Sequence, residues 1–112
     1  MTNTDMREPT FLVLSALANG RKHGYAVITE ISELSDGRVR LRPGTLYAAL
    51  DRLREEGLVA VAGEEVVAGR LRRYYQLTDV GAVRLAEEAA RLQTNARNAL
   101  RRLRMRAAGA SA

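Results

Sequence analysis

The 112-residue chain contains no cysteine, no tryptophan and a single histidine, His23. The lack of cysteine excludes disulfides, zinc sites built on thiolates and a cysteine nucleophile. A single histidine excludes a histidine-rich metal cluster, and a serine–histidine–aspartate triad would have to use His23. The chain also lacks a phosphate-loop pattern of the G-x-x-x-x-G-K kind. We therefore expect no catalytic residues, no metal and no cofactor, and we predict that the chain is not an enzyme.

Long apolar runs are absent as well, since none approaches the ~20 residues that a membrane span requires. Residues 1–8 are polar and of mixed charge, unlike a secretion signal. The default expectation is therefore a cytoplasmic protein. The length leaves room for one domain with one modest core.

The net charge of +5 is unevenly distributed. Residues 1–37 carry three basic and five acidic side chains, residues 38–73 eight and five, and residues 74–112 seven and three. Arginine supplies 17 of the 18 basic residues. Its planar fork suits phosphate and guanine, but the same bias is typical of a genome rich in arginine codons. Composition alone leaves both explanations open.

The spacing of apolar residues predicts three helices in the first half of the chain, at Pro9–Asn19, Gly24–Leu34 and Gly44–Glu56. Proline suits a first helical turn, and glycine follows the first and third helices at the position where helices commonly end. Short connections join the three helices, so we expect them to pack as one tri-helical unit.

The pattern then changes to a period of two. Leu58–Ala62 and Arg70–Leu77 read as strands, with Gly63–Gly69 as their connection and the turn within residues 64–69. An isolated two-stranded hairpin is not stable, so it must pack on the helices. Arginines alternate with apolar residues in the stretch 38–42 also, which makes it a candidate for a short third strand.

Thr78 is a candidate N-cap for a last helix that runs from Asp79 to about Arg106. Its leucines and alanines follow the 4-3 spacing of a coiled coil over a length that a domain of this size cannot cover. We therefore expect a partner helix and a two-fold dimer. The expected interface residues lie on the apolar faces of this helix and of the first one: Phe11, Leu85, Ala89, Leu92, Ala96, Ala99, Leu100 and Leu103.

This order of elements predicts a mainly α protein with a small β-hairpin (α+β), a winged helix-turn-helix followed by a long C-terminal dimerisation helix. In this arrangement the third helix enters the major groove and the hairpin, or wing, reaches the adjacent backbone. The expected organisation is a flexible N-terminus at 1–8, a DNA-binding domain at 9–77, the dimerisation helix at 78–106 and a flexible tail at 107–112.

Several motifs in this frame resemble those of the PadR family of bacterial transcriptional regulators, collinearly from Phe11 to Gly81. They are His23-Gly24-Tyr25, Gly44-Thr45-Leu46-Tyr47, Leu50, Arg52-Leu53, Glu56-Gly57-Leu58, Gly69-Arg70, Arg72-Arg73-Tyr74-Tyr75, Leu77-Thr78 and Gly81. A single helix after the wing is similar to the shorter subtype, in which that helix dimerises. The resemblance implies a dimeric winged-helix repressor, often released from its operator by a small aromatic molecule or a drug. It also implies that Tyr25 and Tyr47 lie near the DNA backbone.

We predict DNA contacts from the small or polar residues that open the third helix, from the two tyrosines and from arginines near them and on the wing. These residues are Tyr25, Arg42, Gly44, Thr45, Tyr47, Arg52, Arg70, Arg72 and Arg73. Each has a plainer alternative. The tyrosine rings could simply pack between the second and third helices, and the wing arginines could only blunt a strand edge.

Period two places Arg73 on the opposite face from Arg70 and Arg72. The acidic pair Glu64 and Glu65 makes the tip of the wing a poor phosphate ligand, so we expect contacts along the strand. His23 reads as a loop or cap residue. The basic cluster at the end of the long helix reads as solvated charge that complements the helix dipole; it comprises Arg101, Arg102, Arg104 and Arg106.

An effector would fit between the long helices and the first helices of a dimer. The candidate lining residues are Phe11, Ser15, Leu92, Gln93, Ala96 and Leu100. Small alanines there are more typical of close helix packing than of a cavity, and the lack of tryptophan excludes a pocket built on indoles. The partners predicted are double-stranded operator DNA, a second copy of the chain and a possible small-molecule effector. The alternative function is a small basic architectural protein that binds RNA or DNA without sequence choice.

Overall fold

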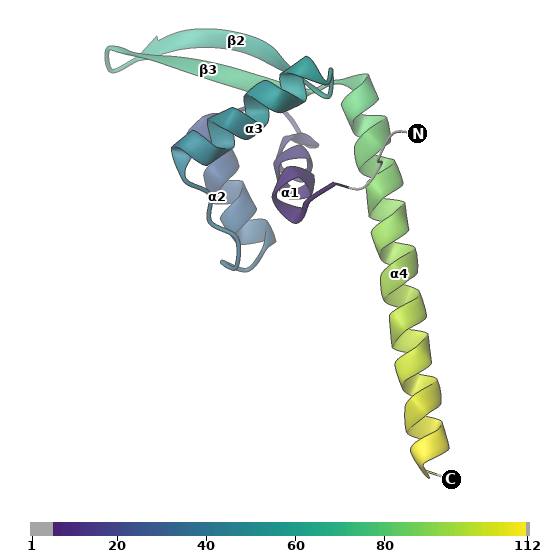
Figure 1. The fold of residues 1–112 in the computed structure, drawn as a ribbon. Coiled ribbons are helices and arrows are strands. Elements are labelled where there is room, and N and C mark those ends of the chain that lie inside the picture. Colours follow the sequence, from purple (N-terminus) through teal and green to yellow (C-terminus); the bar gives the residue numbers. More distant parts are fainter. Residues whose placement is uncertain (1–5, 112) are drawn as a thin grey trace.

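The structure, a computed structural model, describes residues 6–111, so residues 1–5 of the predicted flexible N-terminus lie outside it. Three short helices and a small sheet form one body, and a long helix runs away from that body (Figure 1). The elements in chain order are α1 (Glu8–Leu17), β1 (Lys22–His23), α2 (Gly24–Leu34), α3 (Pro43–Glu55), β2 (Val59–Val67), β3 (Arg70–Leu77) and α4 (Asp79–Ser111). This is the predicted α+β fold with a long C-terminal helix.

The core lies where α1, α2 and α3 meet. α1–α3 begin and end within two residues of the predicted bounds, because apolar spacing and proline or glycine boundaries specify them locally. Pro9 lies in the first turn of α1. Beyond the other end, the Lys22 ammonium donates to the Ala16 carbonyl oxygen at 2.6 Å. The largest fully buried side chains come from all three helices: Val13, Leu14, Leu17, Val27, Ile31, Leu46, Leu50 and Leu53.

The hairpin is longer than predicted, because β2 continues to Val67 and only Ala68 and Gly69 form the turn. Both turn residues have positive φ, at 50° and 76°, as a tight two-residue hairpin requires. The prediction that residues 63–67 connect the strands was wrong. Glu64 and Glu65 read as a polar loop in the sequence, but they pair in register with Arg73 and Arg72.

The third strand is also not where the alternation of arginines suggested it. β1 pairs with β3 through Lys22 opposite Tyr75 and His23 opposite Tyr74, which gives the sheet order β1-β3-β2. Residues 38–42 form no strand and instead lead into α3. Val39 packs against the core, and its amide donates to the Ser35 hydroxyl at 2.9 Å, so this stretch is held by the helices.

α4 is locked to the body at its first turn. The Thr78 hydroxyl accepts from the Gly81 amide at 2.9 Å and donates to the Gly57 carbonyl at 2.7 Å, which confirms it as the N-cap. A Cβ on Gly81 would lie 2.1 Å from the Leu58 carbonyl oxygen. A capping box would place Glu or Gln at position 81, three residues after Thr78, but no side chain fits there.

The rest of α4 projects from the body (Figure 1). Every residue from Leu92 to Ala110 is exposed. The helix continues past the predicted end at Arg106 to Ser111, so most of the predicted tail is helical, consistent with the alanines at 107, 108 and 110. Within residues 6–111 no helix, α4 included, combines the length and apolar content needed to cross a membrane.

Candidate nucleic-acid interface

The start of α3 is unobstructed. Leu46, Leu50 and Leu53 point into the core, so the opposite face of the helix looks outward. Gly44 and Ala48 lie exposed on that outward face, and a Cβ built on Gly44 would meet no atom within 4 Å. Another molecule can therefore approach the N-terminal amides of α3 closely, and those amides favour an anion.

Tyr47 lies on one flank of this face and packs directly on α2. A Cβ on Gly24 would lie 2.3 Å from the Tyr47 hydroxyl oxygen, so only glycine allows the ring to lie here. Burial, together with the nearby hydroxyls of Tyr75 and Tyr25, raises the pKa of Tyr47. The phenol therefore keeps its proton and remains a hydrogen-bond donor. Tyr47 is 38% exposed and Tyr25 63% exposed, so both rings also reach the surface.

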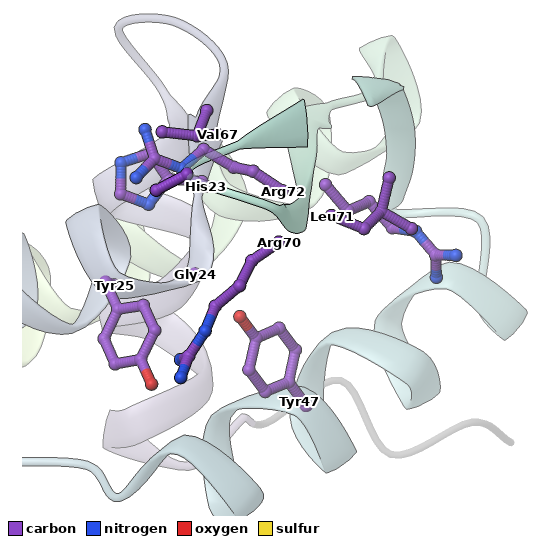
Figure 2. Close-up of a pocket in the computed structure, with 10 residues that line it drawn as sticks. His23, Gly24, Tyr25, Tyr47, Val67, Arg70, Leu71 and Arg72 are labelled. Carbon is purple, nitrogen blue, oxygen red and sulfur yellow. The ribbon is translucent and has the colours of Figure 1, made fainter. Parts of the chain in front are cut away.

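A hollow of about 290 Å³ lies between the starts of α2 and α3 and the wing. Figure 2 shows Arg70 extended between the rings of Tyr25 and Tyr47, while Arg72 turns toward His23. The lining residues combine arginines and phenols with a few apolar side chains: His23, Gly24, Tyr25, Tyr47, Val67, Ala68, Arg70, Leu71, Arg72 and Arg73. None of them is acidic, so the hollow favours anions.

The acidic residues of the wing are paired within the chain. Glu64 lies opposite Arg73, with 3.4 Å between carboxylate oxygen and Nε, and the Tyr74 hydroxyl donates to Glu65. A hydrogen bond with Tyr75 and the charge of Glu64 raise the pKa of Arg73. Alternation along β3 places Arg73 on the face of buried Tyr75, opposite Arg70 and Arg72, although all three arginines line the hollow.

His23 is the N-cap of α2, as the sequence suggested. Its Nδ1 accepts from the Ala26 amide at 3.4 Å, and its ring meets Tyr74 edge-on with centroids 5.7 Å apart. Burial and, secondarily, the charge of Arg72 lower the pKa of His23. The cap requires an unprotonated Nδ1, so both effects favour the form of the ring that caps the helix.

Two predicted contact residues lie on the other flank of α3, toward α1. Arg52 donates to the Thr10 hydroxyl at 2.9 Å and pairs with Glu56 at 3.5 Å, so it is held within the chain. Thr45 lines a shallow hollow of about 480 Å³ that Arg52 shares. Arg42 is exposed at the N-cap position of α3, where its side chain makes no capping bond. The structure thus brings Tyr25, Tyr47 and the wing arginines together and leaves Arg52 apart from them.

The residues predicted for the dimer interface and the effector pocket divide into two groups. Leu85 packs against the core of its own body, and Phe11 is half-buried on α1. The Ser15 hydroxyl is already used, because it donates to the Phe11 carbonyl at 2.8 Å. The remaining side chains lie exposed on α4: Ala89, Leu92, Gln93, Ala96, Ala99, Leu100 and Leu103. Both assignments stay predictions.

Two functional features escaped sequence reasoning. The contact of Gly24 with Tyr47 joins two motifs 23 residues apart. The sequence offered packing of the tyrosine rings between the second and third helices as an alternative, but it did not pair Tyr47 with Gly24. Glu88 is buried on α4, where a carboxylate three residues after Leu85 and three before Arg91 could have been noticed as an acid beside the apolar stripe. In the described part of the chain, His, Asp and Glu side chains form no group of three or more that could hold a metal.

A tri-helical unit with an open third helix, a paired wing and a basic hollow between them defines a winged helix-turn-helix protein. Comparison with known proteins identifies the family of winged-helix proteins to which the chain belongs. The Transcriptional regulator PadR-like family matches residues 13–87, and the chain belongs to that family. Membership places it among transcriptional regulators and not among enzymes.

Individual relatives agree. The chain is 41% identical over 88 residues to the transcriptional regulator Rv3488 of Mycobacterium tuberculosis, covering 79% of this chain and 78% of that protein. A PadR family regulator from Eggerthella lenta superposes with a TM-score of 0.69 at 29% identity, covering 85% of this chain and 80% of that one. Bacillus subtilis PadR in complex with operator DNA shares the fold, with a TM-score of 0.64 at 22% identity over 72% of this chain and 46% of that one.

Proposed function

We propose that this regulator binds operator DNA through α3, the start of α2 and the wing, and that it acts in the cytoplasm as a homodimeric repressor. The observation that carries the proposal is the hollow in which Arg70 extends between Tyr25 and Tyr47, beside the open start of α3 (Figure 2). Bacillus subtilis PadR, of the same fold, was solved with operator DNA bound.

The chemistry of the hollow suits the phosphodiester backbone. Its arginines supply charge, and the protonated phenol of Tyr47 supplies a neutral donor. The acids that would repel phosphate, Glu64 and Glu65, are already paired with Arg73 and Tyr74. Backbone contacts of this kind orient the protein on DNA without reading the sequence.

The exposed face of α3 would read the base sequence of the operator. Gly44 and Ala48 let the helix enter the major groove, and Thr45 has a hydroxyl there that can bond a base edge. Arg42 immediately precedes the helix and is exposed. Arg52 reads a base only if it leaves Thr10 and Glu56.

The exposed leucines of α4 support the homodimer. Leu92, Leu100 and Leu103 are 40%, 56% and 57% exposed, and an isologous pairing of two α4 helices would cover them. Such a dimer presents two recognition helices to one face of the duplex. We expect half-sites about one helical turn apart, roughly 10 bp centre to centre.

Repression and its release by a small aromatic or drug-like effector follow from the family resemblance. The proposed effector site lies between the long helices and the first helices of the dimer, lined by Phe11, Ser15, Leu92, Gln93, Ala96 and Leu100. Effector binding there would release DNA only if the effector prefers the subunit arrangement that does not fit the operator.

Mobility-shift titrations on the DNA upstream of the protein's own gene test the proposal. Arg70→Ala and Tyr47→Phe should each weaken DNA binding about tenfold, which is a loss of about 1.4 kcal/mol in binding free energy. Arg102→Ala lies on distal α4, the part of the helix after Leu92, and should not weaken binding. Tyr47→Phe keeps the ring, so an unchanged affinity means that Tyr47 only packs on Gly24. Equal affinity for operator and random DNA would support the alternative, an architectural protein without sequence choice.

A further inference from the structure

Glu88 is the one buried charged side chain among residues 6–111, with 2% of its surface exposed. It lies on α4 three residues beyond Leu85, which packs against the core. A buried ionised carboxylate is costly unless it is paired and hydrogen-bonded. The DNA-binding surface does not include it.

The partners of Glu88 come from its own helix and from the chain before α1. Arg91 donates to both carboxylate oxygens, through Nε at 3.3 Å and through Nη2. These bonds, the Met6 backbone bond and the charge of Arg84 hold the pKa of Glu88 below its usual value. Met6 itself packs against the core. Glu88 therefore ties α4 to the segment that leads into α1.

Among residues 6–110, Glu88 is the residue furthest along α4 whose side chain is buried. The first attachment is at the start of the helix, where Thr78 and Gly81 contact Gly57 and Leu58. Beyond Arg91 every residue as far as Ala110 is exposed. The contacts at the start of α4, at Leu85 and at Glu88 together define the direction of this rigid helix, and Glu88 lies furthest along it.

A small change at Glu88 is magnified along the helix. Arg104 lies 16 residues further on, about 24 Å at 1.5 Å per residue. A 10° rotation about Glu88 would move Arg104 by about 4 Å from this geometry. In a dimer joined through distal α4, the same rotation moves the two recognition helices relative to each other.

We infer that Glu88 is a positioning residue that sets the angle between α4 and the winged-helix body, and thereby the half-site separation that the dimer recognises. The second part rests on the proposed homodimer, whereas the first part concerns a single chain. Removing the charge of Glu88 should release the Met6 segment and leave α4 held by its first turn and by Leu85.

The absence of cysteine allows a direct measurement of the angle. Spin labels at Glu55→Cys on α3 and Arg104→Cys on α4, in chains diluted with excess unlabelled protein, report the distance within one chain by pulsed electron resonance. Glu88→Gln should shift the mean distance by about 4 Å or widen its distribution by a similar amount. Glu87→Gln, an exposed neighbour that loses the same charge, is the control and should match the wild type. An unchanged distribution in folded Glu88→Gln overturns the inference.

If Glu88→Gln does not fold, Glu88→Asp is measured instead, because it keeps the charge but shortens the reach by one methylene. A shifted or widened distribution in the aspartate variant supports the inference, and an unchanged one overturns it. Melting curves of each variant separate a loss of stability from a change of angle. A merely structural role would lower the melting temperature without altering the distance.

Operators with spacers changed by 1 or 2 bp test the consequence for DNA. The wild type and Glu87→Gln should prefer one spacing by tenfold or more, and Glu88→Gln should lose or shift that preference. Retention of the wild-type preference by Glu88→Gln overturns the second part of the inference. Sedimentation of the wild type as a monomer contradicts the proposed dimer instead, and the label distance still decides the role of Glu88.

Discussion

The winged-helix body and the distal half of α4 are built from similar residues but differ in what those residues contact. In the body, leucines such as Leu46 and Leu50 are fully buried by other segments of the chain. In distal α4, Leu100 and Leu103 are more than half exposed. The arginines differ in the same way. Arg52 and Arg73 have partners within the body. The part of α4 after Leu92 carries five arginines and no acidic residue.

This difference divides the chain into a region that buries its apolar side chains within one copy and a region that leaves them exposed. The body closes its hydrophobic core within one copy and can present a defined surface to DNA. Distal α4 leaves a stripe of leucine and alanine that only another molecule can cover. The two regions meet at Thr78, Gly81 and Glu88, which fix one to the other.

The largest expected difference is in folding. Leu50→Ala removes a fully buried side chain and should lower the free energy of unfolding by about 2–5 kcal/mol. Leu100→Ala removes one that is 56% exposed and should change the unfolding of the isolated body little. Urea unfolding at low protein concentration, where association contributes least, measures both. Equal losses would mean that the single-chain burial pattern does not describe the protein in solution.

The next expected effect concerns assembly. Leu92→Glu combined with Leu103→Glu should raise the dimer dissociation constant a hundredfold or more, about 2.7 kcal/mol, because both carboxylates would enter the apolar seam. Thr94→Glu with Met105→Glu has the same spacing on the opposite face of α4 and serves as the control. Sedimentation velocity measures both pairs. A control that dissociates as readily as the test pair would show that the seam is not the predicted stripe.

Gly24→Ala should destabilise the winged-helix body at the contact between α2 and Tyr47. The new methyl group would lie 2.3 Å from the Tyr47 hydroxyl oxygen, so the ring must move, at a cost of about 1–3 kcal/mol in stability. Operator affinity should fall with it. Gly44→Ala meets no atom within 4 Å and should not lower the melting temperature, because alanine is the better helix former, while its methyl group hinders approach to DNA. If Gly24→Ala kept both the wild-type melting temperature and the wild-type operator affinity, the contact between Tyr47 and Gly24 would contribute to neither stability nor DNA binding.

Arginines of the two regions should respond differently to salt. Arg72→Ala should weaken binding to all DNA sequences alike and reduce the slope of log K against log salt by about 1, since one phosphate contact is lost. Arg101→Ala on distal α4 should leave the slope unchanged, because we predict that its charge is only solvated. Titrations between low and physiological salt measure the slopes. A reduced slope for Arg101→Ala would assign distal α4 a contact with DNA.

The smallest expected effect is the pH dependence of the α2 cap. Because the pKa of His23 is lower in the folded chain than its unfolded value of about 6.5, its contribution to stability is present above that pH and lost as the pH falls below it. His23→Asn keeps a capping oxygen that does not titrate. Thermal unfolding between pH 5 and 8 should therefore show a stability loss of about 1 kcal/mol or less at low pH for the wild type and a smaller one for the variant.

Much of this protein follows from the sequence alone, because its information is local. Apolar spacing with Pro9, Pro43 and glycine boundaries predicts α1–α3, and Thr78 marks the start of α4. The recognised motifs also predict the family correctly. Helix periodicity and end signals act over a few residues, so no knowledge of the tertiary structure is needed to read them.

Other features depend on segments that are distant in the chain, and only the tertiary structure decided them. Strand pairing is such a case: Lys22–His23 has no strand signal but lies beside β3, while the alternating stretch 38–42 is held by helices. Glu64 and Glu65 became strand because arginines lie opposite them. Glycine at 24 and at 81 is required by Tyr47 and Leu58, and burial of Glu88 depends on the segment before α1. Packing and pairing energies depend on which groups meet in space, and sequence spacing does not specify that.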